Sequence, residues 1–270
     1  MQSSDTLFVG SIPEVYERCL GPLLFKPFAT DLASRARALG GARLIEIAAG
    51  TGIATRAIAQ ALPSAQIEAT DLNEAMVRIG AALVDAPNVR WSVADAMALP
   101  FAPATFDLAI CQFGAMFFPD CSLAMREIRR VLSPGGAFVF NVWDDLEGND
   151  VSRIIWKTAA DIFPDDPPSF LPRVPYGHGQ PATLEAQLQA AGFSEIVWEL
   201  VEKPSGAIPA RDAATGVCQG TPTYHEIVNR DASRLADIIE NATRRLQDEF
   251  GGDTVGGRMR AFVFTACVAR

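Results

Sequence analysis

The chain has 270 residues, of which 49% are hydrophobic and 20% are charged, enough apolar material for one large α/β domain or a core domain with an insertion. Its formal net charge of −9 argues against a nucleic-acid partner and an anionic membrane surface, because both require a basic face and the sequence has no run of Lys and Arg. A small-molecule partner is therefore expected. The 5 cysteines include no CxxC pair, and the N-terminus lacks the basic start and apolar run of a signal peptide, so we expect reduced thiols, no metal site and a cytoplasmic protein.

The first predicted element is a helix over residues 13–39, with a break at Gly21-Pro22. Residues 42–143 then alternate short, nearly continuous apolar runs with helical patterns, which is typical of parallel strands covered on both faces. This alternation predicts a doubly wound, Rossmann-like α/β sheet that is mostly parallel. The expected strands are residues 42–48, 65–70, 89–94, 106–113 and 137–143, and the expected helices between them are residues 53–62, 74–84 and 120–132.

Short signals mark the ends of these helices. Pro63 closes the first helix, and Asn73 is placed to cap the N-terminus of the second through its side-chain oxygen. Residues 133–136, Ser-Pro-Gly-Gly, are predicted to end the third helix and to turn the chain sharply into the fifth strand.

The second half of the chain predicts further helices and two late strands. Residues 151–163 are an amphipathic helix candidate, residues 164–181 a proline-rich loop, and residues 183–191 a helix that ends at Gly192. Residues 195–201 and 261–268 are predicted to form an antiparallel pair of strands whose connection carries a helical insertion. The insertion includes an amphipathic helix over residues 233–250, which could cover a pocket or form a homodimer contact.

The first predicted strand runs into the glycine loop Glu46-Ile47-Ala48-Ala49-Gly50-Thr51-Gly52, and a helix follows. Glycine lets the backbone approach a ligand closely, and open sheets bind ligands at the carboxyl ends of their strands. Such a loop alone indicates a nucleotide-like ligand, and the alternative is a tight turn with no ligand.

Acidic residues follow the next two predicted strands. Asp71 ends the second strand, where a carboxylate can accept both hydroxyls of a ribose; alternatively, it only helps to start the next helix. Asp95 ends the third strand, where a carboxylate can accept the exocyclic amine of an adenine; alternatively, it belongs to an ordinary strand-end turn. Together with Glu46, these acids fall on one edge of the sheet and converge, which favours an adenosine ligand.

With these motifs, the sequence resembles the class I S-adenosylmethionine-dependent methyltransferases, in the small-molecule branch similar to the ubiquinone-biosynthesis methyltransferases. The resemblance is dense over residues 40–145 and elsewhere rests only on the order of the elements. The motifs that carry it are the glycine loop with Glu46, Asp71-Leu72-Asn73, Ala94-Asp95-Ala96 with Leu99-Pro100-Phe101 after it, Phe106-Asp107-Leu108-Ala109, and Glu127-Ile128-Arg129-Arg130-Val131-Leu132-Ser133-Pro134-Gly135-Gly136.

The resemblance implies S-adenosylmethionine as methyl donor, S-adenosylhomocysteine as product and a small-molecule methyl acceptor. The sequence departs from the family at Ala48, where a first glycine is usual; the methyl group is compatible with the turn if φ stays negative. The implied cofactor contacts are Glu46, Ala48, Gly50, Thr51 and Gly52 for the methionine portion, Asp71 for the ribose, Leu72, Asp95 and the backbone of Ala96 for the adenine, Gln112 for the sulfonium end, Tyr16 and Phe25 of an N-terminal helix for the methionine carboxylate, and Met76 and Met97 as further candidates.

One methyltransferase domain is accordingly expected over residues 1–270, with its last strand antiparallel. Most of the motifs fall in its central part. The expected parts are an N-terminal helical cap (1–40), a cofactor-binding core (41–145), helical lid or insertion segments (146–182 and 204–258), and a C-terminal helix with strands (183–203 and 259–270).

Two other functions remain open at this point. A nicotinamide-dependent Rossmann oxidoreductase shares the glycine turn and the acid after the second strand, but its G-x-G-x-x-G fingerprint lacks a third glycine here, where Thr55 stands, and gives Asp95 no role. A regulatory module could keep the cofactor site without catalysis.

The expected chemistry is an in-line displacement at an activated methyl carbon, in which proximity and the exclusion of water are the main contributions. Of the 2 histidines, His178 is a candidate general base in a glycine-flanked loop, with a solvated loop histidine as the alternative, and His225 is expected to be structural. Aromatic residues after the fifth strand suggest an apolar or aromatic acceptor, unless they only pack against the sheet; they are Trp156, Phe163, Phe170 and Tyr176.

Overall fold

The computed structural model describes residue 5 and residues 10–177 and 180–270 of the chain. These residues form two compact units. The core unit comprises residues 28–143, 179–201 and 261–270, and the helical unit comprises residues 1–27, 144–178 and 202–260.

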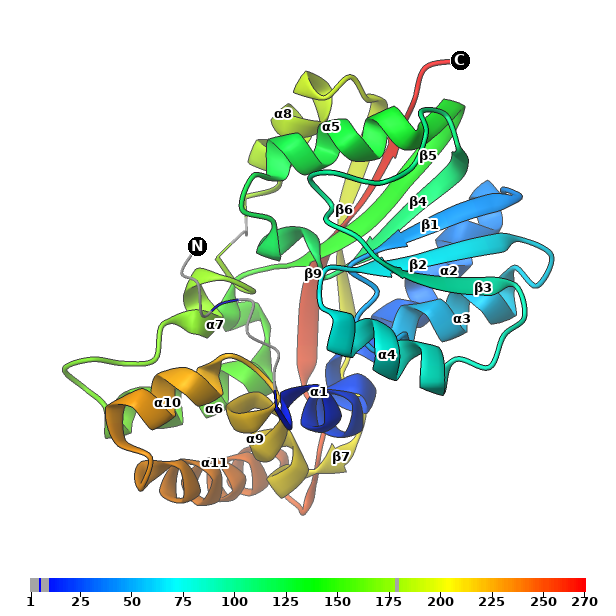
Figure 1. Ribbon diagram of the computed structural model, residues 1–270. Coiled ribbons are helices and arrows are strands. Elements are labelled where there is room, and N and C mark those ends of the chain that lie inside the picture. The colour runs from blue at the N-terminus through cyan, green and yellow to red at the C-terminus, as the bar shows by residue number, and fades with distance from the viewer. Residues whose placement is uncertain (1–4, 6–9, 178–179) are drawn as a thin grey trace. The chain divides into compact units, whose positions relative to one another are not determined.

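A seven-stranded sheet, in the order β3-β2-β1-β4-β5-β9-β6, organises the core unit (Figure 1). The pairs from β3 to β5 are parallel, and the last strand, β9, is antiparallel to β5. The predicted doubly wound sheet with an antiparallel last strand is therefore confirmed. The strands are β1 Arg43–Ile47, β2 Gln66–Asp71, β3 Val89–Val93, β4 Phe106–Gln112, β5 Leu132–Trp143, β6 Ser194–Pro204 and β9 Arg258–Cys267.

Helices connect the parallel strands. The helices α3 and α4 join β1 to β2 and β2 to β3, whereas α5 joins β4 to β5 on the other side of the reversal in strand order, so right-handed crossovers place α5 on the opposite face. Helices α5 and α8 pack side by side (Figure 1). The bounds are α2 Lys26–Leu39, α3 Ile53–Ala61, α4 Glu74–Leu83, the short 3-10 helix η3 Ala115–Phe117, α5 Cys121–Val131 and α8 Pro181–Ala190.

The predicted cap of α4 is confirmed. The side-chain oxygen of Asn73 accepts the backbone N–H groups of Ala75 at 2.9 Å and Met76 at 3.4 Å. Such a cap contributes about 1 kcal/mol to helix stability. The cap fixes the start of α4 directly after Asp71, at the carboxyl edge of the sheet.

Stacked aromatic rings fill the centre of the sheet on β5 and β9. Phe138 and Phe140 have ring centroids 4.6 Å apart, and Phe140 stacks on Phe264 of the neighbouring strand at 4.7 Å. All three are among the largest fully buried side chains, and each contributes about 1.5–3 kcal/mol through burial. This rigid centre supports the strand ends that carry the candidate site.

The predicted helix over residues 13–39 does not break at Gly21-Pro22. It runs as α1 (Ile12–Val15), a π-helix η2 (Tyr16–Phe25) that contains Pro22, and α2. Proline removes one backbone donor and clashes with the preceding turn of an α-helix. The wider π-helical turn, with bonds such as that from the Lys26 N–H to the Gly21 carbonyl, passes this position without a break.

The prediction that β5 begins at residue 137 is also wrong, because β5 begins at Leu132. Leu132 pairs with Phe106, and the next pair, Ala137 with Leu108, shows that the intervening residues bulge out of the ladder. Gly135 takes φ +77°, and its N–H donates to the carbonyl of Val268 at 3.1 Å. The Ser-Pro-Gly-Gly segment is therefore a bulge within the strand.

The helical unit is built around α11. The apolar stripe of this helix, with Ile238, Ala242 and Leu246, is buried, and α11 packs on α6 and α9. This stripe is thus not available for a homodimer contact, which would need another surface. The elements are the 3-10 helix η4 Leu146–Gly148, α6 Asp150–Ile162, α7 Phe170–Arg173, α9 Ala210–Gln219, α10 Thr223–Asp231, α11 Arg234–Phe250, and the short antiparallel pair β7 Ile208–Pro209 and β8 Thr254–Val255.

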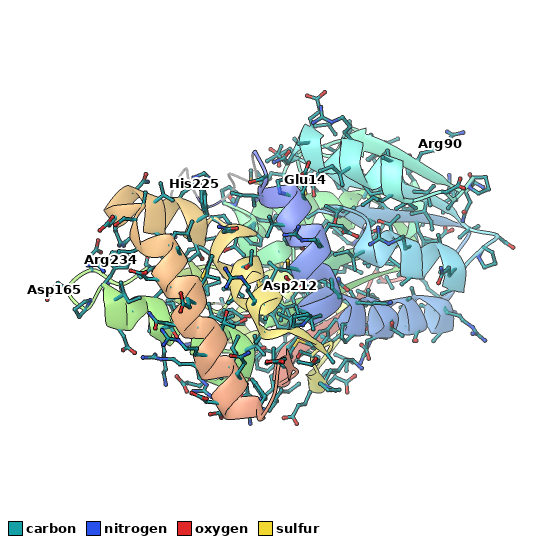
Figure 2. All side chains as sticks on the ribbon, turned by 90° about the horizontal axis from the view of Figure 1, so that it is seen from below. Glu14, Arg90, Asp165, Asp212, His225 and Arg234 are labelled. Carbon is teal, nitrogen blue, oxygen red and sulfur yellow. The ribbon has the colours of Figure 1, made fainter. Side chains whose placement is uncertain are left out.

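Charged side chains lie on the outside of both units, as the labelled Arg90 of the core unit and Glu14 and Arg234 of the helical unit illustrate (Figure 2). Within the described residues, none of the helices has the length and apolar character needed to cross a bilayer.

Candidate functional site

The register of the parallel strands brings the predicted site residues of three strands onto one face of the sheet. Glu46 of β1 pairs with Ala69 of β2 and with Ile110 of β4. Paired residues in a parallel sheet point to the same face, and the direction alternates along each strand. Asp71 and Gln112, each two residues further along, therefore share the face and the carboxyl edge of Glu46.

The glycine loop after β1 is fixed by backbone hydrogen bonds to the end of β2. The N–H of Ala49 donates to the carbonyl of Thr70 at 2.9 Å, and the N–H of Gly50 donates to Oδ2 of Asp71 at 2.9 Å. Gly50 has φ +57°, and a Cβ atom there would meet nothing within 4 Å. The loop thus presents an open, side-chain-free backbone at the edge of the sheet, as close approach of a ligand requires.

The condition that allowed Ala48 to replace a glycine is not met, because Ala48 has φ +54°. Phe113, in the turn after β4, has φ +52°. The left-handed conformation costs a non-glycine residue about 1–2 kcal/mol. Strained residues of this kind persist where the surrounding structure holds them, and they cluster at functional sites.

Glu46 is a buried carboxyl group with one oxygen that lacks a hydrogen-bond partner among the described residues. Its side chain is only 2% exposed, and Oε2 has no hydrogen-bond partner among the described residues. Burial, with a further contribution from the Asp71 carboxylate, raises the pKa of Glu46 to about 8, while the Thr55 hydroxyl and the Arg56 guanidinium oppose the shift. A carboxylate in this place calls for a cationic partner, and the ammonium group of an amino acid fits.

The carboxylate of Asp71 accepts hydrogen bonds from the local backbone and still has acceptor positions for a ligand. Its Oδ1 accepts the N–H of Asn73 at 2.8 Å and its Oδ2 accepts the N–H of Gly50 at 2.9 Å. Burial raises the pKa of Asp71, and the backbone amides of Asn73, Gly50 and Leu72 oppose the shift. Because an ionised carboxylate offers about four acceptor positions, Asp71 keeps capacity for a hydroxyl donor. The two sequence-based interpretations of Asp71 are therefore compatible.

Exposed apolar side chains and a closed turn lie beside Asp71. Leu72 is 62% exposed and Val93, which pairs with Asp71 in the sheet, is 50% exposed. In the next turn, Oδ1 of Asp95 accepts the N–H of Met97 at 2.8 Å. Val93 was not among the sequence-predicted site residues, although its position before Ala94 and Asp95 at a strand end was a usable signal.

Other predicted residues of this region are buried parts of the core unit. They are Thr51, Met76 and Ala96, with exposed fractions of 1%, 5% and 7%. Their side chains thus pack within the core unit.

Asn141 of β5 is a polar residue that the sequence analysis missed. It is fully buried, its Oδ1 accepts the N–H of Phe113 at 2.9 Å, and its Nδ2 has no partner among the described residues. It pairs with Gln112 in the sheet, so it shares the face of the site. Its signal was a lone amide inside the otherwise apolar run of residues 137–143.

An aromatic cluster packs beside Asn141. Phe113 stacks on Trp143 with ring centroids 3.7 Å apart, and Phe28 of α2 meets both rings edge-on at 5.2 and 5.4 Å. These rings hold the strained turn after β4 from its apolar side.

Tyr16 and Phe25, the predicted N-terminal contacts, belong to the helical unit. Their rings stack on each other with centroids 4.8 Å apart along the π-helix. His178 lies outside the described residues. His225 is half-buried in the first turn of α10.

The aromatic residues predicted to cap an acceptor pocket also lie in the helical unit. Phe170 and Tyr176 are buried, and the Tyr176 hydroxyl donates to Oγ of Ser152 at 2.7 Å, or accepts from it. The indole N–H of Trp156 donates to the carbonyl of Pro168 at 2.8 Å. These contacts give the proline-rich segment a defined structure, including the short helix α7.

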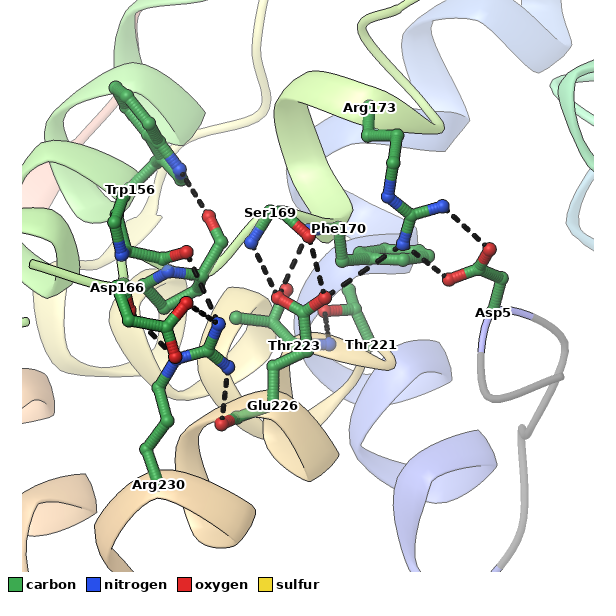
Figure 3. A network of polar contacts seen from close by, with 12 residues as sticks. Asp5, Trp156, Asp166, Ser169, Phe170, Arg173, Thr221, Thr223, Glu226 and Arg230 are labelled. Carbon is green, nitrogen blue, oxygen red and sulfur yellow. Dashed lines mark hydrogen bonds and ion pairs between the residues drawn. The ribbon is translucent and has the colours of Figure 1, made fainter. Parts of the chain in front are cut away.

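A polar network anchors this segment to α10 (Figure 3). Glu226 accepts the N–H groups of Ser169 at 2.6 Å and Phe170 at 3.0 Å, and so caps α7 from another helix. The guanidinium of Arg173 donates to both carboxylate oxygens of Asp5 at 2.7 and 2.8 Å. The part of the chain that the structure describes contains no group of three or more His, Cys, Asp or Glu side chains arranged to hold a metal ion.

Comparison with known proteins agrees with this geometry. The sequence model of the family described as "Methyltransferase domain" matches residues 45–140. A demethylmenaquinone methyltransferase of Corynebacterium kroppenstedtii is 30% identical over 185 residues, which cover 65% of this chain and 76% of that protein. A ubiquinone/menaquinone biosynthesis C-methyltransferase of Saccharophagus degradans is 30% identical over 186 residues, covering 64% and 74%.

The fold is shared with a solved enzyme that contains S-adenosylhomocysteine. The phosphoethanolamine N-methyltransferase 2 of Haemonchus contortus, in complex with phosphomonomethylethanolamine and S-adenosylhomocysteine, has a TM-score of 0.63 at 16% identity and covers 100% of this chain and 61% of that chain. At this identity, the likeness concerns the fold alone.

The family model and the relatives show an enzyme that transfers a methyl group from S-adenosylmethionine to a small molecule. The chain belongs to the class I S-adenosylmethionine-dependent methyltransferases, in the branch of the ubiquinone and menaquinone biosynthesis methyltransferases. These findings give no support to the nicotinamide-dependent oxidoreductase or to the non-catalytic module.

Proposed function

We propose that S-adenosylmethionine binds along the carboxyl edge of β1, β2, β3 and β4, and that Glu46 is the main anchor of its amino group. The observation that carries this proposal is the buried, unpartnered Oε2 of Glu46, with its raised pKa, in the strand that runs into the open backbone of Gly50. A cationic amino group would supply the missing partner and make the ionised carboxylate favourable.

The other side chains of this edge would divide the rest of the cofactor among them. Asp71 would accept ribose hydroxyls with its remaining acceptor positions, and Leu72 and Val93 would lie against the adenine. Asp95 and the backbone of Ala96 would bind the edge of the adenine. The loop residues Ala48, Gly50, Thr51 and Gly52 would line the methionine portion, with Gln112 at the sulfonium end and Met97 beside the adenine.

When bound, the cofactor supplies a methyl group already activated by the positive sulfonium. The protein then has to orient the acceptor at attack distance and exclude water. The turn after β4, held by Asn141 and by the ring cluster of Phe28, Phe113 and Trp143, would keep Gln112 in place for this task. Tyr16 and Phe25 would close over the methionine carboxylate.

An apolar or aromatic acceptor that is methylated on carbon fits the chain best. The names of the two relatives support this, since one is a demethylmenaquinone methyltransferase and the other a C-methyltransferase of ubiquinone and menaquinone biosynthesis. The aromatic residues of the helical unit, such as Phe170 and Tyr176, agree with such an acceptor. Methylation on carbon also requires a proton to leave the acceptor, and His178 is the candidate base.

The division of labour in the chain follows from these roles. The segments 1–40, 146–182 and 204–258 would act as a helical cap and lid over the acceptor, within one methyltransferase domain. The net charge of −9 and the 5 scattered cysteines favour a cytoplasmic enzyme with no nucleic-acid partner.

Calorimetry with S-adenosylhomocysteine tests the cofactor site. Asp71→Asn should weaken binding about tenfold or more, as expected when charged hydrogen bonds to a ligand are lost. Asp107→Asn is a matched control, because Oδ2 of Asp107 also accepts two backbone N–H groups, those of Ala42 and Arg43 at 2.9 Å, but at the opposite end of the sheet. Absence of binding heat with the unmodified protein would contradict the proposal.

A turnover screen tests the acceptor. Hydroxyaromatic and quinol acceptors with an unsubstituted ring carbon should be methylated on that carbon, as located by mass spectrometry and NMR of the product. Small amines and aliphatic alcohols, which offer only nitrogen or oxygen, form the comparison set. Exclusive methylation of nitrogen or oxygen would leave the methyltransferase assignment intact and would refute the proposed acceptor class.

A further inference from the structure

We propose that Glu127 and Arg130 of α5 are positioning residues for adenine recognition, because they hold the loop that presents Asp95 and Ala96. Neither side chain is among the proposed cofactor contacts; both act through the loop backbone. The inference rests on the proposed contact of Asp95 with the adenine.

The pair binds both backbone polar groups of Leu99, which lies four residues after Asp95. The N–H of Leu99 donates to Oε2 of Glu127 at 2.9 Å, and the carbonyl of Leu99 accepts Nη2 of Arg130 at 2.8 Å. A second guanidinium nitrogen, Nη1 of Arg130, donates to the carbonyl of Phe101 at 2.7 Å. The loop backbone is thus bound at three points by one helix.

The two side chains also form an ion pair with each other. Nε and Nη2 of Arg130 donate to Oε1 and Oε2 of Glu127, each at 2.8 Å, in a two-pronged ion pair across one turn of α5. The Arg130 guanidinium, together with the Leu99 N–H, lowers the pKa of Glu127. Two-pronged Arg–carboxylate pairs are geometrically specific, so the pair offers the loop a rigid frame.

A hydrogen-bonded turn connects Leu99 to Asp95, so fixing the backbone of Leu99 also restricts Asp95. The N–H of Ala98 donates to the carbonyl of Asp95 at 3.0 Å, and the N–H of Met97 donates to its Oδ1 at 2.8 Å. The side chain of Leu99 is 4% exposed and anchors the turn in the core. With one end of the turn on β3 and the other on α5, the Asp95 carboxylate is held in a fixed direction.

If the pair had a purely structural role, its removal would lower stability and leave the ratio of the affinities for the two ligands unchanged. If it has a positioning role, its removal should also reduce the preference for a ligand whose purine carries the 6-amino group over one whose purine lacks it. The probes are S-adenosylhomocysteine and its 6-deamino analogue, in which a purine replaces adenine, measured by calorimetry on the full chain.

Arg130→Met keeps the aliphatic stem but removes every hydrogen bond of the guanidinium. We expect S-adenosylhomocysteine to bind about tenfold weaker, as for lost charged hydrogen bonds, and the preference over the deamino analogue to shrink toward one. Arg129→Met is the matched control, because the neighbouring Arg129 donates from Nε to the carbonyl of Gly192 at 3.2 Å and does not reach the loop. It should leave both affinities unchanged.

Glu127→Gln and Arg130→Lys supply graded variants if Arg130→Met folds poorly. Glu127→Gln keeps an acceptor for the Leu99 N–H but loses the ion pair, and Arg130→Lys keeps the charge but not the fork. Both should show an intermediate preference, with the KM for S-adenosylmethionine raised more than kcat is lowered. Equal weakening of both ligands, or a full preference in every variant, would overturn the inference while leaving the cofactor site intact. If the unmodified protein bound neither ligand, the proposed function would fall and this inference with it.

Discussion

The side-chain oxygen of Asn141 accepts the backbone N–H of Phe113 at 2.9 Å, so a buried residue of β5 fixes the turn that follows β4. Phe113 stands at φ +52°, a conformation that a bulky residue adopts only when its surroundings impose it. Gln112 directly precedes this turn. The hydrogen bond therefore links the interior of the sheet to the residue proposed at the sulfonium end of the cofactor.

Asn141→Val should lower both stability and turnover. The Phe113 N–H would lose its buried acceptor, which costs about 1–3 kcal/mol of unfolding free energy. A shift of the Gln112 turn should also reduce kcat about tenfold to a hundredfold, as small misplacements of positioning groups do. Urea unfolding and methyl-transfer kinetics measure the two effects.

A matched control for this variant is Asn88→Ala. It removes another hydrogen bond from an amide side chain to the backbone, from Nδ2 of Asn88 to the carbonyl of Ala65 at 2.8 Å, away from the carboxyl edge. This control should lose stability and keep kcat. If both variants lowered kcat in parallel with stability, the positioning role of Asn141 would be refuted.

Glu46 should make stability depend on pH in an unusual direction for a carboxyl group. Its folded pKa of about 8 lies above the ordinary value of 4.5, so the folded state binds the proton more tightly than the unfolded state. The contribution to stability is therefore fully present below pH 4.5 and is lost as pH rises through about 8. Glu46→Gln should abolish this part of the slope in thermal unfolding measured from pH 5 to 9.

Binding of the cofactor should release the proton of Glu46. Around pH 6.5 the carboxyl of the free protein is protonated, and a ligand ammonium group would favour its ionised form. Calorimetry with S-adenosylhomocysteine in two buffers of different ionisation enthalpy reports the number of protons released. Proton release that persists in Glu46→Gln would show that another group is responsible.

Sequence periodicity was sufficient to predict the order and type of the parallel strands and crossover helices of the core unit, although not the start of β5, because these elements are set by local hydrophobic patterns. The convergence of Glu46 and Asp71 followed from topology, since both end parallel strands of one sheet. Their roles toward a ligand remain predictions.

Features that depend on distant contacts could not be predicted in this way. The positive φ of Ala48 is imposed by its surroundings, and the uninterrupted π-helix at Pro22 depends on backbone hydrogen bonds that a hydrophobic pattern does not encode. The bounds of α9 within the predicted helical segment 204–258 were not predicted, and its close contact with η2 relies on small residues; a Cβ at Gly216 would lie 2.8 Å from Cβ of Cys19. Such contacts leave no periodic trace in the sequence.

The anchor of the α7 segment on α10 gives a prediction about local motion. Glu226 accepts the N–H groups of Ser169 and Phe170 (Figure 3). In Glu226→Ala these donors lose their partner, at about 1–3 kcal/mol for each buried group. Hydrogen exchange of residues 166–173 should accelerate, while the strands of the core unit keep their protection.

The control for this variant is Glu240→Ala on α11. The side chain of Glu240 is 66% exposed and its contact with Arg244 is 3.9 Å long, so the pair contributes little to stability. Its removal should leave exchange in residues 166–173 unchanged. Unchanged exchange in Glu226→Ala as well would disprove the anchoring role of Glu226.

The packing between Ala48 and Gly114 leads to a prediction about coupled substitutions. A Cβ atom on Gly114 would lie 2.5 Å from Cβ of Ala48 and 2.7 Å from Sγ of Cys111. Gly114→Ala should therefore destabilise the protein by about 1–3 kcal/mol, as overpacking of a core does. Ala48→Gly alone should change stability by less than about 1 kcal/mol, because relief at φ +54° is offset by the greater freedom of glycine in the unfolded chain.

In the double variant, Ala48→Gly should restore part of the stability lost in Gly114→Ala, because one of the two clashing atoms is gone and the contact with Sγ of Cys111 remains. Urea unfolding of the single and double variants should show the double variant to be about 0.5–3 kcal/mol more stable than the sum of the two single effects predicts, the range for residues in contact. Gly251→Ala at the end of α11 serves as the reference, since φ there is +74° and a Cβ would meet nothing within 4 Å. It should lower stability through backbone strain, and its effect should add to that of Ala48→Gly. Strict additivity in the Ala48 and Gly114 cycle would mean that this contact does not restrict the turn after β4.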